Sequence, residues 1–334
     1  MYAIAKQSEK NRSELFQGTV GKIHKFNNAI VEKDFWVCLT LDYLFNRCKF
    51  KDSFTFKGGT SLSKAWDVIE RFSEDIDLIL DWQILGYSKN EPNEDRTKTS
   101  QEKFNKQANQ KAEKFIGTEL LETLENDFKF ILKTDSVFKI DEKDKQTILF
   151  YYPKQFSSEG IVPAIRLEIG PLAAWTPSEN VEIQSYAAEA YPKVFKQAKT
   201  VVRTVTAART FWEKATILHQ LANMPEGKPF KSRYSRHYYD ILRLANSTYK
   251  DDAFKSKDLL EKVAKFKQKF YPCGYAQYDK ARIGSLKLEP PLHLIEALKK
   301  DYKDMEEMIY GEKPDFSTLL EGIKKLETEI NSLA

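Results

Sequence analysis

Cysteine and histidine are scarce in this chain of 334 residues, and neither follows the spacing of a disulfide frame or a zinc site. The three cysteines, Cys38, Cys48 and Cys273, are an odd number and include no C-x-x-C pair. The four histidines never reach the H-E-x-x-H spacing of zinc enzymes. We therefore expect no disulfide frame and no zinc, and we expect the protein to work in a reducing compartment, the cytoplasm.

Long apolar runs are also missing, and neither sign of charge predominates. No window approaches 18 consecutive apolar residues, so no membrane span is expected. The stretch MYAIAKQSEKNRSELFQGTV lacks the basic start and apolar block of a signal peptide. The net charge of +4 permits nucleic-acid binding but does not argue for it, because a solvated surface explains it equally well.

The chain does contain enough apolar residues, 41% of the total, for one large domain or two ordinary ones. Up to about residue 200, short alternating runs mix with helical spacings, whereas strand signals fade after residue 186. These patterns predict an α+β fold of two domains. Residues 1–200 would form a mixed sheet with helices, and residues 201–334 a helical C-terminal domain.

Several elements are predicted inside this frame. Strands are expected over 53–56 and 73–80, with a helix over 61–70 between them. The polar residues 86–114 predict a solvated loop that leads into a helix through 130. Further strands are expected in TILFYYP and AIRLEIGP. The helices expected in the second domain cover 207–223, 232–246, 256–270, 291–310 and 316–332.

Two aspartates on the strand 73–80 are candidate metal ligands. Alternation places Ser73, Asp75 and Asp77 on one face, while Ile76 and Leu78 point into a core. Two carboxylates at this spacing can converge on a pair of magnesium ions, which prefer oxygen ligands completed by water and phosphate. By itself an Asp-x-Asp pair is common on strand edges and loops, so its context decides.

That context is a glycine turn before the aspartates. Gly58 and Gly59 allow backbone amides to approach an anion closely, and Ser61 adds a hydroxyl near the start of the following helix. The glycines would hold the phosphates of a nucleotide, and the aspartates would hold the metal that bridges them. A Gly-Gly turn alone is a weak signal, but the order of strand, turn, helix and acidic strand makes a chance arrangement much less plausible.

The stretch GGTSLSKAW, followed by RFSEDIDL, resembles the signature of the AbiEii/AbiGii toxin family of nucleotidyltransferases. This family belongs to the DNA polymerase β-like nucleotidyltransferase superfamily and is related to the MenT toxins. Further blocks similar to the family are VEKDFW (31–36), FWEKATILH (211–219), SRHYYDILRL (235–244) and YDKARIGSLKLEP (278–290).

The resemblance implies a polymerase β-like core and a set of site residues. Asp75 and Asp77 would bind metal, with Ser73 beside them and Gly59 and Ser61 at the phosphates. From the helical half, Lys214 would touch the triphosphate and Asp240 would complete the site. His237 stands where many relatives carry aspartate, and this leaves the local partner of Arg236 open.

The residues themselves leave alternatives for the helical half. Lys214 lies off the expected buried stripe of its helix and would be free to reach a site, but an exposed lysine paired with an acid is the plainer explanation. Arg236, Asp240 and Arg243 fall on one helix face, which suits either a site or a structural ladder of ion pairs.

Glu168 is the candidate for a third carboxylate that activates the incoming hydroxyl. It alternates with apolar residues in AIRLEIGP, on a strand expected to neighbour the aspartates. An ion pair with Arg166 on an edge strand is the alternative.

The function expected from these residues and the resemblance is magnesium-dependent transfer of NMP from an NTP to an acceptor hydroxyl. By resemblance the protein would be the toxin of a toxin–antitoxin or abortive-infection system, with a cognate antitoxin as partner. Tyr, Arg and Lys interleave over 231–239 and 271–282, which suits an RNA acceptor such as a tRNA 3′ end. The alternatives are a protein acceptor, a nucleotide- or antitoxin-binding module without turnover, and a nucleic-acid-binding structural protein.

Overall fold

A computed structural model of the chain describes residues 1–133, 137–158, 162–172 and 177–334, and it divides into two compact units. Unit 1 consists of Met1–Ala65 and Ser73–Val205, and unit 2 of Trp66–Phe72 and Thr206–Ala334. The chain therefore leaves unit 1 after Ala65, returns after Phe72 and leaves again after Val205. A single boundary near residue 200 does not describe this excursion of seven residues.

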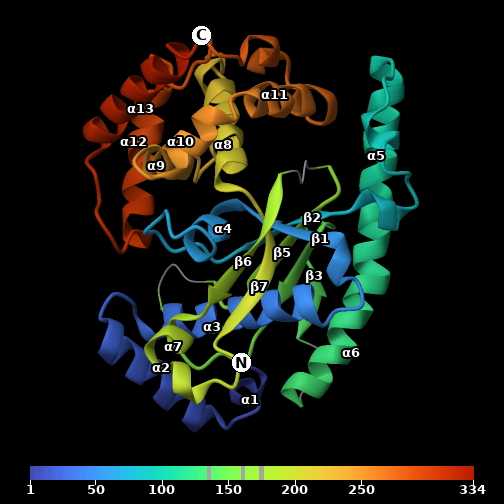
Figure 1. Cartoon of the computed structure of the whole chain (residues 1–334), viewed down its shortest axis with the longest axis vertical. Coiled ribbons are helices and arrows are strands. Elements are labelled where there is room, and N and C mark those ends of the chain that lie inside the picture. The colour runs from blue at the N-terminus through green and yellow to red at the C-terminus, as the bar shows by residue number, and fades with distance from the viewer. Residues whose placement is uncertain (134–136, 159–161, 173–176) are drawn as a thin grey trace. The chain divides into compact units, whose positions relative to one another are not determined.

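Within the described part of unit 1, seven strands form one mixed sheet in the order β3-β4-β5-β2-β1-β7-β6 (Figure 1). The central pair β1–β2 is antiparallel, and each of its members has a parallel neighbour, β7 beside β1 and β5 beside β2. The strands are β1 Phe54–Lys57, β2 Ile76–Leu80, β3 Phe138–Ile140, β4 Thr147–Phe150, β5 Ile165–Gly170, β6 Ser178–Gln184 and β7 Lys199–Val205. This sheet confirms the predicted α+β class.

Helix α3 packs against this sheet, on strands β5 and β7, and is buried along most of its length. It begins after Asn27, whose side chain accepts a hydrogen bond of 2.9 Å from the amide of Ile30. The helices of unit 1 are α1 Tyr2–Ala5, α2 Glu9–Ile23, α3 Asn28–Asn46, α4 Gly58–Lys64, α5 Lys98–Phe115, α6 Leu121–Leu132 and α7 Tyr186–Ala190.

Two expectations for unit 1 are wrong. The polar stretch 86–114 is helical from Lys98 onward, and a π-helical turn over 116–120 joins α5 to α6. Phe104, Ala108 and Ala112 recur every four residues and are buried, which gives the polar helix one apolar side. The helix expected over 61–70 begins at Gly58 and ends at Lys64.

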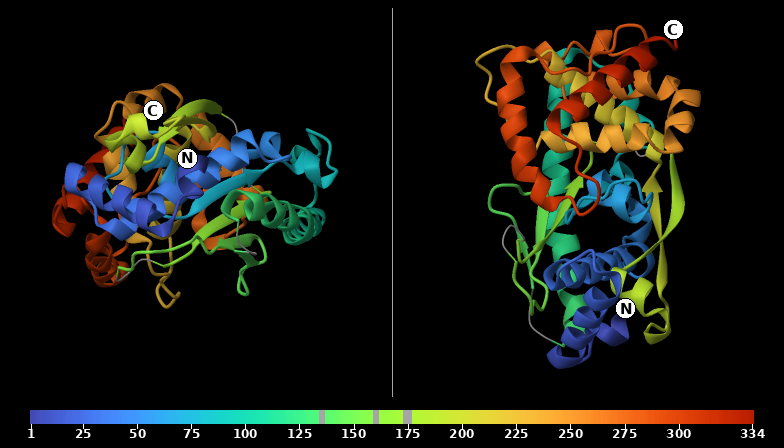
Figure 2. Two further views of the ribbon diagram at one scale, coloured as in Figure 1. Left: turned by 90° about the horizontal axis from the view of Figure 1, so that it is seen from below. Right: turned by 90° about the vertical axis from the view of Figure 1, so that its left-hand side faces the viewer.

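In unit 2 six helices of five or more residues pack together, and all lie in fully described segments. Helix α8 contacts α9, α10 and α11, and α9 also contacts α12 and α13. The helices are α8 Ala207–Ala222, α9 Ser235–Ala245, α10 Tyr249–Lys255, α11 Asp258–Phe270, α12 Ile295–Met305 and α13 Phe316–Asn331. Five of them follow the predicted positions, whereas α10 was not predicted (Figure 2). None of the helices in the described segments could cross a membrane.

The segment 66–72 is extended where it pairs with residues 308–310 of the same unit. The Phe72 amide donates to the Met308 carbonyl at 2.7 Å, and the Tyr310 amide donates to the Glu70 carbonyl at 2.9 Å. These bonds form an isolated antiparallel bridge. The excursion is therefore fixed in unit 2 by backbone hydrogen bonds, which is incompatible with the helix predicted there.

Candidate active site

The glycine turn and the second aspartate are in direct contact in unit 1. Strand β1 runs straight into α4 at Gly58, whose φ of +81° lies in the left-handed region. A Cβ atom built on Gly58 would lie 1.9 Å from Oδ2 of Asp77 and 2.6 Å from its Cγ. The Asp77 carboxylate therefore lies against the Cα of Gly58, where a side chain would displace it.

The face predicted for the acidic strand is visible in the burial of its residues. Strand β2 begins at Ile76, three residues later than predicted. Ser73, Asp75 and Asp77 are nevertheless half-buried, and the residues between them, Glu74 and Ile76, are buried. This alternation fits side chains that point in turn to a partly open face and to the core.

Thr60 connects the first turn of α4 to this acidic segment. Its hydroxyl Oγ1 donates to the Asp75 carbonyl oxygen at 2.5 Å and lies 3.0 Å from Ser73 Oγ. Thr60 is fully buried, whereas its partners Ser73 and Asp75 are half-buried, so both contacts are part-buried. The turn and the Asp75 backbone are thereby held at a fixed separation.

The predicted phosphate-binding residues surround the start of α4. Gly58 and Gly59 are half-buried, and the residue before them, Lys57, makes no side-chain capping bond to the helix amides. Ser61 is fully buried, and its hydroxyl donates to the Gly58 carbonyl at 2.8 Å. The serine thus stabilises the turn through the donor that was expected to face a phosphate.

Glu168 lies beside Asp77 on the neighbouring strand. In the parallel β2–β5 pair Asp77 is the partner of Glu168, and in the antiparallel β1–β2 pair it is the partner of Lys57. Paired residues of adjacent strands share a face, so Lys57, Asp77 and Glu168 form one row of half-buried polar side chains. Sequence reasoning missed Lys57, although it directly precedes the glycines.

The alternative role of Glu168 is also present. Arg166 Nε lies 3.2 Å from Glu168 Oε1, and its Nη1 lies 2.6 Å from Asp141 Oδ2. Strand β5 is internal to the sheet, not the edge strand that the alternative assumed. The hydrogen bond from the Lys143 amide, together with the hydrogen bond from Arg166, holds the pKa of Asp141 below its usual value.

The donor set of the aspartate pair fits magnesium. Nowhere in the described residues do three His, Cys, Asp or Glu side chains form a metal-binding group. Magnesium does not require such a group, because it usually takes one or two carboxylates and completes its shell with water and substrate phosphates. Asp75 and Asp77, half-buried and next to a glycine turn, supply that number of carboxylates.

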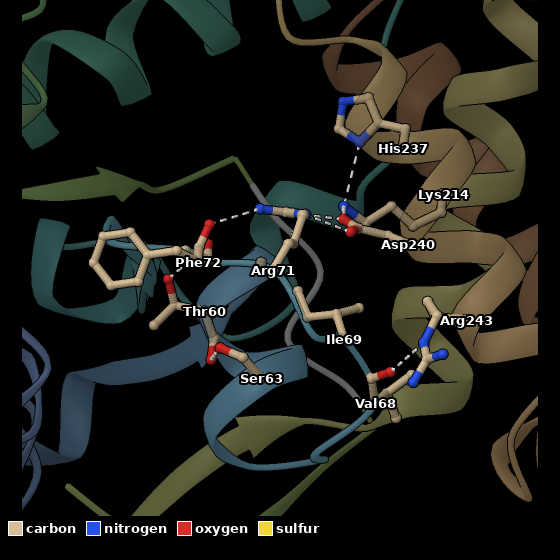
Figure 3. Close-up of polar contacts among 12 residues, drawn as sticks. Thr60, Ser63, Val68, Ile69, Arg71, Phe72, Lys214, His237, Asp240 and Arg243 are labelled. Atoms are coloured by element: carbon tan, nitrogen blue, oxygen red, sulfur yellow. Dashed lines mark hydrogen bonds and ion pairs between the residues drawn. The ribbon is translucent and has the colours of Figure 1, made fainter. Parts of the chain in front are cut away.

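Two of the predicted residues of the helical half, Lys214 and Asp240, form a buried ion cluster with Arg71 within unit 2 (Figure 3). Asp240 is fully buried and accepts from Arg71 Nε at 2.7 Å, from Arg71 Nη2 at 2.8 Å and from Lys214 Nζ at 2.7 Å. The expectation that Lys214 lies off the buried side of its helix is wrong, because only 6% of it is exposed. Arg71, on the excursion segment, was not identified from the sequence.

In helix α9, Arg243 does not join the expected ladder of ion pairs with Asp240. Arg243 pairs with Glu70 at 3.0 Å and donates to the Val68 carbonyl at 3.2 Å, so it too binds the excursion segment. Arg236 is half-buried in the first turn of the helix. The carboxylate of Asp240, which was to link these two arginines, is instead shared by Arg71 and Lys214.

Burial and nearby charges keep Asp240 ionised and His237 neutral. Burial would raise the pKa of Asp240, but Arg71 and Lys214 hold it well below its usual range. Burial and the nearby charges of Lys214 and Arg236 lower the pKa of His237 well below its usual value. Neutral His237 can then accept at Nδ1 from Lys214 Nζ, 3.2 Å away, which places its ring proton on Nε2.

Comparison with known proteins identifies the family of this chain. A sequence model described as "Nucleotidyl transferase AbiEii toxin, Type IV TA system" matches residues 41–322. The chain belongs to the AbiEii family of nucleotidyltransferase toxins. The match includes the glycine turn, both aspartates, Glu168 and the cluster around Asp240.

Solved structures similar to this AbiEii-family chain include two bacterial proteins. MenT4, a nucleotidyltransferase toxin from Mycobacterium tuberculosis H37Rv, is 14% identical, with 96% of this chain and 97% of that chain covered and a TM-score of 0.45. JHP933 from Helicobacter pylori is 12% identical, with 92% and 99% covered and a TM-score of 0.36. No curated protein sequence matches the chain.

Proposed function

We propose that this nucleotidyltransferase toxin uses magnesium to transfer NMP from an NTP to a hydroxyl of RNA, specifically a tRNA 3′ end, and that an antitoxin protein is its partner in the cell. The observation that carries the catalytic part is the contact between Gly58 and the Asp77 carboxylate. It joins a phosphate-binding turn to a metal-binding carboxylate within one small site.

The residues of the site would bind the metal, bind the phosphates and accept a proton. Asp75 and Asp77 hold the metal, and the amides at Gly58 and Gly59 bind the phosphates. When bound, magnesium would neutralise charge on the triphosphate and assist in-line attack of the acceptor hydroxyl at the α-phosphate, with pyrophosphate as the leaving group. Glu168, in register with Asp77, takes the proton of the acceptor hydroxyl once Arg166 has released its carboxylate.

By resemblance to the family, Lys214 and Arg236 also take part in substrate binding, and Asp240 completes the catalytic residues. Lys214 Nζ is bound by Asp240 and His237, so a phosphate would have to replace or join these partners. A variant that keeps the positive charge tests this: Lys214→Arg should retain folding and alter the KM for NTP.

Replacement of each aspartate tests the catalytic assignment. Asp75→Asn and Asp77→Asn keep the side-chain shape and remove the charge, so we expect transfer of label from NTP to fall by more than about 100-fold, since even outer partners of metal ligands are worth 10–100-fold. Asp52→Asn, at an exposed aspartate just before β1, is the matched control. Full transfer by folded Asp75 and Asp77 variants would remove the assignment.

Incubation of the wild type with each labelled NTP, magnesium and purified tRNA or lysate tests the acceptor. Label on tRNA, in a reaction that weakens steeply with added salt, supports RNA as acceptor. Label on protein with tRNA unlabelled replaces RNA by a protein hydroxyl and leaves the nucleotidyltransferase assignment standing. No label with any NTP favours the binding module without turnover.

A further inference from the structure

Two consecutive residues of helix α3 form buried ion pairs on either side of the excursion. Lys33 is fully buried, and its Nζ lies 2.5 Å from Glu74 Oε2 and 2.7 Å from the Val162 carbonyl oxygen. Asp34, also buried, lies 2.6 Å from Lys64 Nζ and accepts from the Tyr186 amide at 2.7 Å. All of these contacts are within unit 1.

Lys64 and Glu74 flank the excursion in the sequence, one on each side. Lys64 is the last residue of α4 and stands one residue before the chain leaves unit 1. Glu74 is the second residue after the chain has returned. One helix therefore fixes both ends of the excursion, through two neighbouring side chains.

Lys64 and Glu74 also belong to the two parts of the candidate site, namely the helix that begins with the glycine turn and the segment that carries the aspartates. Glu74 points to the buried side, so the next residue, Asp75, points to the half-buried face, and a shift of the backbone at Glu74 moves Asp75 with it. Lys64 fixes the helix whose first residues are the glycine turn. Thr60 connects the two parts by its bond to the Asp75 carbonyl.

We propose that the α3 clamp, consisting of Lys33–Glu74 and Asp34–Lys64, positions Asp75 and the glycine turn for metal and nucleotide binding. This inference rests on the proposed function. The four residues act as positioning residues because none of them lies on the half-buried face that carries Asp75 and Asp77.

The same helix supplies a matched control in Glu32. Its carboxylate is fully buried and accepts from the amides of Gln155, at 2.9 Å, and Phe156, at 3.0 Å. These contacts hold another segment of unit 1 and do not involve α4 or β2. Glu32→Gln therefore removes a buried charge from the same block without releasing the clamp.

The test compares the double variant Lys33→Met, Glu74→Gln with Glu32→Gln. The double change removes both charges together, because removal of one alone leaves the other buried and unpaired. Amide hydrogen exchange is expected to speed up at least tenfold over 58–64 and 73–77 in the double variant. In Glu32→Gln it is expected to speed up around 155–156 only.

Manganese binding, followed by electron paramagnetic resonance, gives the second measurement. The dissociation constant for manganese should rise about 10- to 100-fold in the double variant, the range typical for loss of groups that orient metal ligands. It should stay within twofold in Glu32→Gln. Unchanged exchange over 73–77, or equal weakening of manganese binding in both variants, would overturn the clamp.

A milder change keeps the inference testable if the double variant does not fold. Glu74→Asp retains the charge and shortens the side chain by one methylene, and it should produce the same changes to a smaller extent, whereas unchanged exchange and binding would again overturn the clamp. Failure of the proposed function is recognised separately. If the wild type binds manganese but transfers no NMP, the function fails and the exchange measurement still decides on the clamp.

Discussion

Gly58 has two reasons to be glycine, and they can be separated. Gly58→Ala forces a left-handed conformation on alanine and drives its Cβ into the Asp77 carboxylate, so we expect NTP transfer to fall at least about tenfold through displacement of a metal ligand. Gly86 has a similar φ, +84°, with nothing within 4 Å of a built Cβ. Gly86→Ala should therefore cost about 1 kcal/mol of unfolding free energy and leave transfer intact.

Measurement of transfer and of urea unfolding for both alanine variants checks this prediction. Equal loss of transfer in both would show that backbone strain, and not the contact with Asp77, limits the enzyme. Normal transfer by Gly58→Ala would place the metal away from Asp77.

For single residues, the sequence predicted the features that are determined by residues nearby in the chain. The shared face of Ser73, Asp75 and Asp77 follows from alternation, and the glycine turn from its composition. The environment of Lys214 could not be predicted, because its partner Asp240 is recruited by Arg71, which is 169 residues away from Asp240 in sequence. A helical pattern shows which side is apolar, but not whether the polar side is also covered.

Arg71 anchors the excursion Trp66–Phe72 to helix α9 through its ion pair with Asp240. Arg71→Met leaves Asp240 fully buried with one cation instead of two, and we expect the unfolding free energy to fall by about 3–5 kcal/mol. Arg243→Met removes a partly exposed pair with Glu70 from the same segment and should cost about 0–1 kcal/mol. Urea denaturation followed by circular dichroism measures both.

Equal stability of the two variants would contradict the assignment of Arg71 as the anchor. The comparison is matched because both residues are arginines that join the excursion to helix α9, and they differ mainly in burial and in the number of hydrogen bonds.

Elements were predicted well where one face is clearly apolar and poorly where the inward residues are small or polar. Strand β7 was missed because two of its inward residues are Thr200 and Thr204, while Val201 is 44% exposed. Helix α5 was missed because its apolar side is narrow and the rest is polar. Both elements are stabilised by the residues they pack against. These residues lie elsewhere in the sequence, so a local pattern does not show them.

The stability of unit 2 should depend on pH through two of its histidines. Burial lowers the pKa of both His219 and His237, so the folded protein keeps them neutral while the unfolded chain takes up protons below about pH 6.5. The unfolded state then binds more protons, and the unfolding free energy should fall as pH drops from 7 to 5, by up to about 1.4 kcal/mol per pH unit for each histidine.

Urea denaturation between pH 5 and 8 measures this slope. His237→Asn should remove about half of it, whereas His293→Asn, at an exposed position, should leave it unchanged. Asp240 stays ionised across this range, because its pKa is held well below the usual value, and adds nothing to the slope. A slope that persists undiminished in His237→Asn would contradict the neutral state of that residue.

The order of synthesis gives the excursion a further consequence for the whole molecule. Arg71 leaves the ribosome 169 residues before Asp240, which corresponds to roughly 8 to 34 s at about 5–20 residues per second. Throughout that interval the nascent chain carries the glycine turn and both aspartates with the segment between them unanchored. A chain released before Asp240 is added never receives the carboxylate that Arg71 requires, so anchoring of the segment Trp66–Phe72 through Arg71 needs at least 240 of the 334 residues to be translated.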